Sequence, residues 1–281
     1  MVRSDGVAKW KTRRVRWTGA ALVVVLAIGV GVYALLSHLR PYLHGDNCEV
    51  RTPDGSVRLD LEQAANAATI AAVSQRKHLP EQALVIAYAT AFQESKIRNL
   101  TGGDRDSIGL FQQRPSQGWG KPEKISDPAY ASTRFFDALV KVKRYQTLPV
   151  HEAAQKVQRS ADGSLYAQHE GSAKVMAGGY TGRVTAAVRC WYSPDRRTKP
   201  RLTAAAQLLQ TGYGPPLHVD DGAVSVPNPA LGWSVASWAV SHAQGYGLTE
   251  VRFGGKRWRA DDGFAGWDDD DKAPTDRVII R

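Results

Sequence analysis

The spacing of apolar and polar residues predicts helices along the first two thirds of the chain. In residues 61–77, "LEQAANAATIAAVSQRK", apolar positions recur at helical spacing, and Asp60 with Gln63 resembles a capping box that opens this helix. No strand pattern of comparable strength occurs before Arg183. Helical spacing recurs in four further segments, residues 81–95, 128–142, 150–160 and 165–179.

The segment at residues 81–95, "EQALVIAYATAFQES", is apolar nearly all round from Ala83 to Phe92. Pro80 stands just before it, where a proline is tolerated at the start of a helix. A helix that has apolar side chains on every face is expected inside a domain. We therefore expect an all-α domain over residues 58–192, with this helix at its centre.

The pattern changes after residue 192. Residues 193–200, within "SPDRRTKPR", are rich in proline and charge and are predicted to be a linker. An apparent helix at residues 230–244 follows, and then three short runs that are typical of strands, "TEVRF", "KRWRA" and "RVIIR". We expect a small α+β domain over residues 201–281, and a mainly α fold class for the chain as a whole.

An apolar run near the N-terminus, residues 18–39, contains no Asp, Glu, Lys or Arg. About 20 apolar residues are enough to span a bilayer. A cleaved signal peptide is the alternative, but the run is long and no small-x-small cleavage site follows it. We expect a transmembrane helix at 18–39, between a basic cytoplasmic tail at 1–17 and a stalk at 40–57. The basic tail keeps the N-terminus inside, which predicts a single-pass protein of the cell membrane with its other domains outside.

The net charge adds little beyond this tail. The chain has 281 residues and a formal charge of +10. The mildly basic remainder is compatible with an anionic partner such as a cell-wall polymer or a lipid surface. Nucleic acid is not expected as a partner, because no basic stripe interleaved with aromatic residues occurs after residue 40. About half of the excess comes from the basic residues ahead of Trp17, set against Asp5: Arg3, Lys9, Lys11, Arg13, Arg14 and Arg16.

Two cysteines, Cys48 and Cys190, follow the apolar run. A single disulfide between them is expected if this part of the chain lies in an oxidising compartment. Closing so long a loop would stabilise the fold by up to about 4–5 kcal/mol. The alternative is a pair of free thiols.

Glu94 ends the apolar helix, in the stretch "AFQESKIRNLTGGDRDSIGLFQQ" at residues 91–113. Partial burial disfavours the charged form of a carboxyl group and raises its pKa. A carboxylic acid that stays protonated can donate its proton to a glycosidic oxygen as the bond breaks. The alternative is a surface glutamate at the end of an ordinary core helix.

The loop that follows Glu94 has residue types that suit sugar binding. Gly109 lets a backbone approach a ligand closely. The side-chain amides of Gln112 and Gln113 can donate to and accept from sugar hydroxyl groups. These residues extend the candidate site beyond the single carboxyl group.

At these residues the chain resembles the lysozyme-like superfamily, in particular lytic transglycosylases and goose-type lysozymes. Those enzymes have a helix that ends in Glu-Ser and, a short loop later, a Ser-x-Gly-Leu-(Phe/Met)-Gln turn. The corresponding residues here are Gln93-Glu94-Ser95 and 107–112, "SIGLFQ". The resemblance covers roughly residues 58–190. The wider run is similar to that of membrane-anchored, wall-associated actinobacterial proteins with such a domain.

The resemblance implies a role for each matching residue. Glu94 matches the catalytic general acid/base, and Ser107 and Gln112 match positions that line the cleft near the scissile linkage. The family's later Ala-Tyr-Asn-Ala-Gly segment has no counterpart, since the equivalent region reads "QRSADGSLYAQHEGSA". Tyr166 is our candidate for the substrate-facing tyrosine of that segment.

A second carboxylate would separate two reaction types. Glycosidases that use water generally need a pair of carboxyl groups. A lytic transglycosylase needs only one, because the C6 hydroxyl group of the sugar attacks and leaves a 1,6-anhydro end. Asp104 and Asp106 are the nearest candidates in the sequence, and solvation or capping of their loop is the alternative role for both. We favour a transglycosylase over a muramidase, because a transglycosylase needs neither aspartate.

Three classes of function follow. The leading one is an extracytoplasmic enzyme that cuts the β-1,4 linkage between N-acetylmuramic acid and N-acetylglucosamine in peptidoglycan. A non-catalytic glycan-binding adaptor is the second, and a transporter is the least favoured. No cofactor or metal is expected, since the seven histidines form no HExxH motif. The C-terminal domain at 201–281 is a possible site for a wall-associated protein partner.

Overall fold

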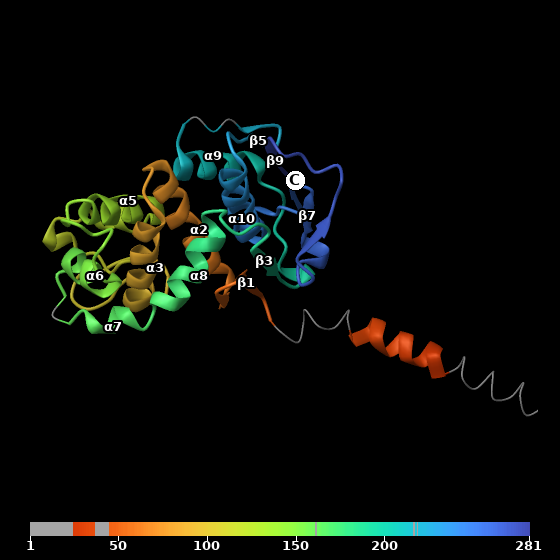
Figure 1. Ribbon diagram of the computed structural model, residues 1–281, viewed down its shortest axis with the longest axis horizontal. Coiled ribbons are helices and arrows are strands. Elements are labelled where there is room, and N and C mark those ends of the chain that lie inside the picture. The colour runs from red at the N-terminus through yellow and green to blue at the C-terminus, as the bar shows by residue number, and fades with distance from the viewer. Residues whose placement is uncertain (1–24, 37–44, 161, 216, 218) are drawn as a thin grey trace, which may run out of the picture. The chain divides into compact units, whose positions relative to one another are not determined.

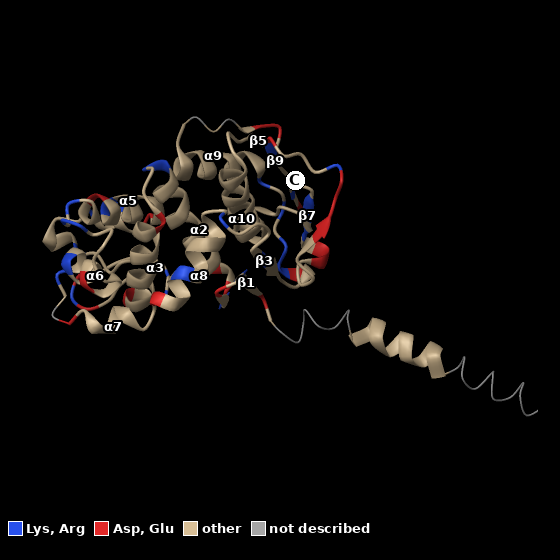
Figure 2. Ribbon diagram, viewed as in Figure 1, with Lys and Arg blue, Asp and Glu red and all other residues tan. Residues whose placement is uncertain are grey.

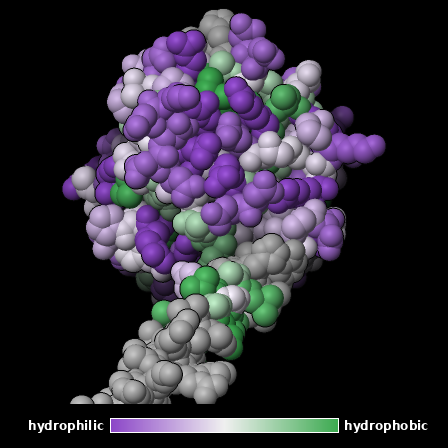
Figure 3. Space-filling model, turned by 90° about the vertical axis from the view of Figure 1, so that its right-hand side faces the viewer, coloured by the Kyte–Doolittle hydropathy of each residue, from purple (hydrophilic) through white to green (hydrophobic). Residues whose placement is uncertain are grey.

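The computed structural model describes residues 25–36, 45–160, 162–215, 217 and 219–281 (Figure 1). The chain forms two compact units, Met1–His44 and Gly45–Arg281. In the first unit, residues 25–36 form a helix with exposed apolar side chains, visible in green in Figure 3. The predicted tail at 1–17 lies outside the described residues.

The predicted transmembrane helix at 18–39 is contradicted. Residues 25–36 are helical, but no helix in the described part of the chain is both long and apolar enough to cross a membrane. The two ends of the predicted segment, 18–24 and 37–39, lie outside the described residues. An unbroken apolar run establishes only that a segment is hydrophobic, whereas a span also requires one helix of about 20 residues.

The expectation of an all-α domain is also wrong, because the unit Gly45–Arg281 opens with an antiparallel sheet. Three strands, β1 (Asn47–Thr52), β2 (Gly55–Leu59) and β3 (Val188–Trp191), pair in the order β2-β1-β3. Strand β1 lies in the segment that we expected to be a stalk. Its hairpin with β2 turns at Pro53 and Asp54, since Thr52 pairs with Gly55. The turn residues Pro53 and Asp54 are a hairpin signal, but β1 and β2 contain few β-branched residues, so that the strand pattern on either side is weak.

The predicted disulfide is present. Cys48 and Cys190 are bonded to each other across 142 positions of sequence. They lie directly opposite each other in β1 and β3, and both are buried. The disulfide therefore fixes the pairing of two strands that come from opposite ends of the helical region.

Helix α3 (Glu81–Ser95) is the central element of the helical region. Its residues from Ala83 to Ala91 are buried, as the all-round apolar pattern predicts. The predicted capping box at Asp60 and Gln63 opens the neighbouring helix α2. Figure 1 shows α3 among its neighbours, and its packing partners are α2 (Leu61–Arg76), α5 (Pro128–Leu139), α6 (Val150–Gln158), α7 (Ser164–Ala167) and α8 (Glu170–Tyr180).

The C-terminal residues form a second sheet with two helices, α9 (Leu202–Tyr213) and α10 (Pro229–Tyr246). The sheet is antiparallel and has six strands in the order β4-β5-β9-β6-β7-β8. It is more extensive than the three runs in the sequence indicate. Its strands are β4 (Val219–Asp220), β5 (Ala223–Ser225), β6 (Glu250–Phe253), β7 (Lys256–Arg259), β8 (Trp267–Asp269) and β9 (Arg277–Ile280).

Helix α10 joins this sheet to the helical region. It packs against β6 and β9 of the sheet and also against α2 and β3. Buried hydroxyl groups add polar contacts at the junction: Ser234 Oγ donates to the Tyr180 carbonyl at 2.7 Å, and Tyr180 Oη bonds Ser241 Oγ at 3.0 Å. Residues 58–192 and 201–281 thus lie within one compact unit.

Candidate active site

Glu94 lies in the last turn of α3, where the chain leaves the helix through residues with positive φ. Lys96 and Ile97 adopt φ values of 55° and 58°. This left-handed turn ends the helix and leads the backbone into the loop at 98–113. The Glu94 side chain is half-buried at this end of the helix.

Tyr166 provides the closest polar contact of Glu94. Its hydroxyl group donates a hydrogen bond of 2.6 Å to Glu94 Oε1. Tyr166 comes from the short helix α7 and is only 2% exposed. Burial, and then the hydrogen bond to Glu94, raise the pKa of Tyr166 well above its ordinary value. The phenol therefore stays protonated and acts as a donor to the carboxyl group. Its contact with substrate stays a prediction.

Ser95 fastens the end of α3 to the following loop. Its hydroxyl group lies 2.7 Å from the Leu110 carbonyl oxygen, which accepts the hydrogen bond, and 3.1 Å from that of Ala91. Within the loop, Ile108 and Gln113 exchange two backbone hydrogen bonds of 3.0 Å. The Glu-Ser end of the helix and the Ser107–Gln112 turn are therefore brought together, as the resemblance implies.

Gly109 is required by a protein contact. Its φ is +78°, and a Cβ atom at this position would lie 2.9 Å from the Ile125 carbonyl oxygen. Its amide donates to the Leu100 carbonyl at 2.8 Å. The close approach here is thus to α4 (Pro122–Ile125), and the contact with a ligand stays a prediction.

The two glutamines of the turn differ in role. Gln113 is 1% exposed and donates through Nε2 to the Ala131 carbonyl in α5 at 3.1 Å. Gln112 is half-buried and donates to the Gly109 carbonyl at 3.1 Å. Gln113 therefore anchors the turn to α5, whereas Gln112 is the amide with a solvent-accessible surface. Ser107, the first residue of the turn, is buried.

The two aspartates contact other groups in their loop. Asp106 accepts from Arg114 Nε at 2.7 Å, and from the amide and hydroxyl groups of Ser116 at 2.8 and 3.0 Å. The hydrogen bond from Arg114, followed by those from Ser116, lowers the pKa of Asp106 far below its usual range. Asp104 has a side chain that is 92% exposed. Among the described residues neither aspartate shares a hydrogen bond with Glu94.

Sequence reasoning missed a polar cluster beside the site. Gln93 Oε1 accepts from Gln168 Nε2 at 3.2 Å and lies 3.1 Å from His169 Nε2. The imidazole also stacks on Phe92, with ring centroids 5.5 Å apart, and burial lowers the pKa of His169. These contacts fasten the segment that carries Tyr166 to the end of α3. No local pattern reveals them, because their members lie some 75 positions apart.

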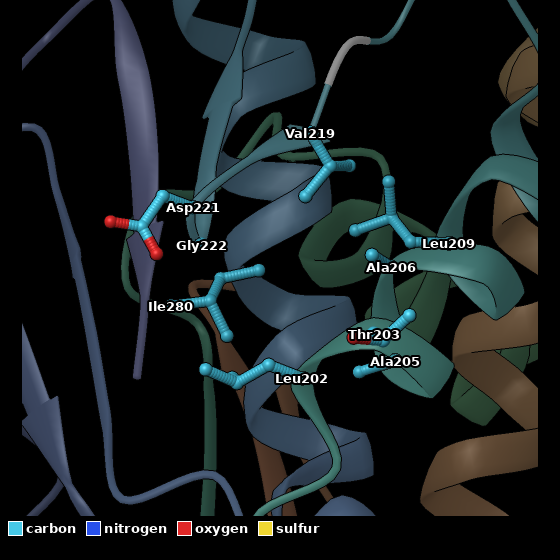
Figure 4. A pocket seen from close by; sticks show the side chains of 9 residues that line it. All are labelled: Leu202, Thr203, Ala205, Ala206, Leu209, Val219, Asp221, Gly222 and Ile280. Atoms are coloured by element: carbon cyan, nitrogen blue, oxygen red, sulfur yellow. The ribbon is translucent and has the colours of Figure 1, made fainter.

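One cavity of about 370 Å³ lies elsewhere, between α9, β4 with the turn that follows it, and β9 (Figure 4). Apolar side chains such as Leu202, Leu209 and Ile280 line most of it. Among the described residues that line it, Asp221 is the one with a carboxylate. Because none of the site residues lines it, this cavity takes no part in the chemistry argued for Glu94.

No protein-family model matches this sequence, and no curated protein matches it either. The part of the chain that the structure describes contains no group of three or more His, Cys, Asp or Glu side chains that could hold a metal ion. The function must therefore be argued from the residues around Glu94.

Proposed function

We propose that this protein cleaves the glycan strands of peptidoglycan, with Glu94 as general acid and then general base. The observation that carries the proposal is the hydrogen bond from the buried Tyr166 hydroxyl group to Glu94 Oε1. It orients a half-buried carboxyl group beside a turn of the type that lines the cleft in lysozyme-like enzymes. The sequence lacks the Ala-Tyr-Asn-Ala-Gly segment of the family, but Tyr166 still contacts the proposed catalytic acid, Glu94.

In the first step Glu94 donates its proton to the glycosidic oxygen between N-acetylmuramic acid and N-acetylglucosamine. The bond from C1 to that oxygen breaks, and the leaving sugar keeps the proton as a hydroxyl group. In the second step the Glu94 carboxylate accepts the proton of the C6 hydroxyl group, whose oxygen attacks C1. The products are a 1,6-anhydro end and an acid restored for the next cycle.

A transglycosylase is favoured over a muramidase because, within the described part of the chain, neither candidate for a second carboxylate shares a hydrogen bond with Glu94. Asp106 is held as a carboxylate by three hydrogen bonds within its own loop. Asp104 projects into solvent. A hydrolase that uses water generally needs a second carboxylate near the first.

The disulfide supports a place outside the cytoplasm, where the substrate of such an enzyme lies. Disulfides persist in oxidising compartments and are rare in the cytosol. The Cys48–Cys190 bond is the feature of the described residues that bears on compartment.

The experiment is digestion of isolated peptidoglycan by the purified full-length protein, with the products identified by mass spectrometry. We expect muropeptides lighter by one water than hydrolysis products, and a rate reduced by at least about 10²-fold in Glu94→Gln. Glu123→Gln, which removes an exposed carboxyl group from α4, is the matched control and should keep the rate.

Other outcomes would replace the proposal. Products with reducing ends would make the protein a muramidase. Glycan that both the wild type and Glu94→Gln bind, and that neither cuts, would make it a binding adaptor.

A further inference from the structure

A second pocket, of about 360 Å³, lies between residues 117–119, α5 and α6. Four cationic side chains line it, Arg134, Lys141, Lys156 and Arg159. Figure 2 shows Lys and Arg segments in blue around α5 and α6. Apolar surface for a ligand comes from Trp119, Val142 and Val157. The cations come from separate segments of the chain, which is why no basic run in the sequence reveals the pocket.

The charge of this basic pocket is not neutralised by the protein. Among the described residues none of the four cations lies within 4.0 Å of a carboxylate. Arg134 donates to the carbonyl groups of Trp119 and Gly118, both at 3.2 Å. The one acidic residue in the lining, Asp137, accepts from Lys77 at 2.8 Å. An excess of positive charge therefore faces the cavity.

Two hydrogen bonds connect the pocket to the proposed active site. Ser95, which follows Glu94, donates to the Leu110 carbonyl at 2.7 Å. The next carbonyl of the turn, that of Phe111, accepts from Gln158 Nε2 at 2.7 Å. Arg159 follows Gln158 directly. The turn at residues 107–112 therefore contacts both the residue after Glu94 and the residue before Arg159, which lines the basic pocket.

We propose that the basic pocket binds the carboxylates of the short acidic peptides that hang from peptidoglycan glycan strands. This inference rests on the proposed function for the choice of substrate. The cations are spread over a cavity of a size that suits a ligand larger than a single phosphate. A peptide with several carboxylates and small apolar side chains matches both the separated cations and the apolar surface of Trp119 and Val157.

The test measures binding of a synthetic acidic stem peptide to the full-length protein by titration calorimetry at low ionic strength. We expect the Lys141→Gln/Lys156→Gln variant to bind about tenfold more weakly, as befits the loss of charge-assisted hydrogen bonds. The matched control is Lys143→Gln/Arg144→Gln, which removes two exposed cations from the same connection outside the pocket and should bind as the wild type does. Inorganic phosphate and a short single-stranded oligonucleotide serve as competing probes.

Equal binding by both double variants, or no binding by the wild type, would overturn the proposal. Tighter binding of phosphate or of the oligonucleotide than of the peptide would also overturn it, in favour of that ligand. The peptide assay involves no cleavage, so its failure is distinguishable from failure of the proposed reaction. If the peptide binds but glycan is not cleaved, only the proposed reaction is contradicted. If glycan is cleaved but the peptide does not bind, only the proposed role of the basic pocket is contradicted.

Discussion

Tyr166 determines which oxygen of Glu94 is free to react. Its hydroxyl group donates to Oε1 at 2.6 Å, and among the described residues no hydrogen bond reaches Oε2. Burial raises the pKa of Tyr166 far above physiological pH, so that the hydroxyl group keeps its proton and stays a donor. In the proposed reaction, proton transfer to and from the sugar therefore falls to Oε2.

The variant Tyr166→Phe isolates this contact. Phenylalanine fills the same buried space but leaves Glu94 without its orienting donor, and a hydrogen bond to a charged group is worth about 1.5–3 kcal/mol. We expect kcat on peptidoglycan to fall by about 10- to 100-fold while KM stays within a few-fold. Steady-state kinetics with a soluble glycan substrate measures both.

Tyr180→Phe is the matched control, because it also removes a buried hydroxyl group, one that bonds Ser241 and the Ala64 carbonyl instead of Glu94. Both variants should lose similar thermal stability, and only Tyr166→Phe should lose kcat. An equal fall in kcat for both would show that Tyr166 acts through packing.

The variant Asp106→Asn tests whether the proposed reaction needs a second carboxylate. We expect Asp106→Asn to retain the transglycosylase rate within a few-fold, because asparagine keeps an acceptor toward Arg114 and Ser116 and no step uses this carboxylate. Turnover of isolated peptidoglycan by Asp106→Asn and by Asp104→Asn gives the answer. A collapse of the rate in either variant would favour the hydrolase.

The Asp106 carboxyl group gives the wild type a pH dependence of stability that Asp106→Asn lacks, and its sign follows from the pKa of Asp106. That pKa is lower in the folded protein than in the unfolded chain, chiefly because of Arg114. The stabilisation is therefore present above the unfolded value of about 4 and is lost as the pH falls through the folded one. The melting temperatures of wild type and Asp106→Asn should differ at pH 7 and converge in strong acid, whereas Asp104→Asn should match the wild type at both.

At the scale of elements, the sequence predicts helices whose ends are marked by nearby residues, but not strands that pair with distant segments. Helix α3 has the predicted bounds, because a long apolar segment with Pro80 before it and a polar loop after it determines both ends. The hairpin of β1 and β2 was missed although Pro53 and Asp54 mark its turn. Strand β3 could not be recognised locally, because its partner β1 lies about 140 positions earlier.

In the candidate site, too, local spacing predicts some features, and contacts between distant segments determine the others. Glu94 and the turn at 107–112 are near each other in sequence, and motif spacing was enough to place them together. Tyr166 was a candidate only through the resemblance, and its contact with Glu94 spans 72 positions. The separate roles of Gln112 and Gln113 depend on α5, whose position relative to the turn no local pattern specifies.

At the scale of the whole molecule, the helical region and the C-terminal sheet form one unit because α10 is buried on every side from Gly232 to Ala243. A helix of that kind needs cover all round, and α2 and the sheet supply it together. The approach is close at Gly182, where φ is +74° and a Cβ atom would lie 1.9 Å from the Ala230 carbonyl oxygen. Only glycine fits there, so this contact with α10 is built into the backbone.

The disulfide acts at this same scale, since it joins the first strand of the unit to a strand that follows the last helix of the helical region. Crosslinking a loop this long restricts the unfolded chain, and removal of a native disulfide typically lowers the free energy of unfolding by about 2–5 kcal/mol. We expect a loss in that range for Cys48→Ser/Cys190→Ser, measured by denaturant unfolding. Both sulfurs are buried, so reductant and an alkylating reagent should label wild type only once denaturant opens the fold. An unchanged unfolding midpoint in the variant would mean that strand pairing between β1 and β3 holds without the covalent bond. Labelling without denaturant would mean that the disulfide is accessible in the folded protein.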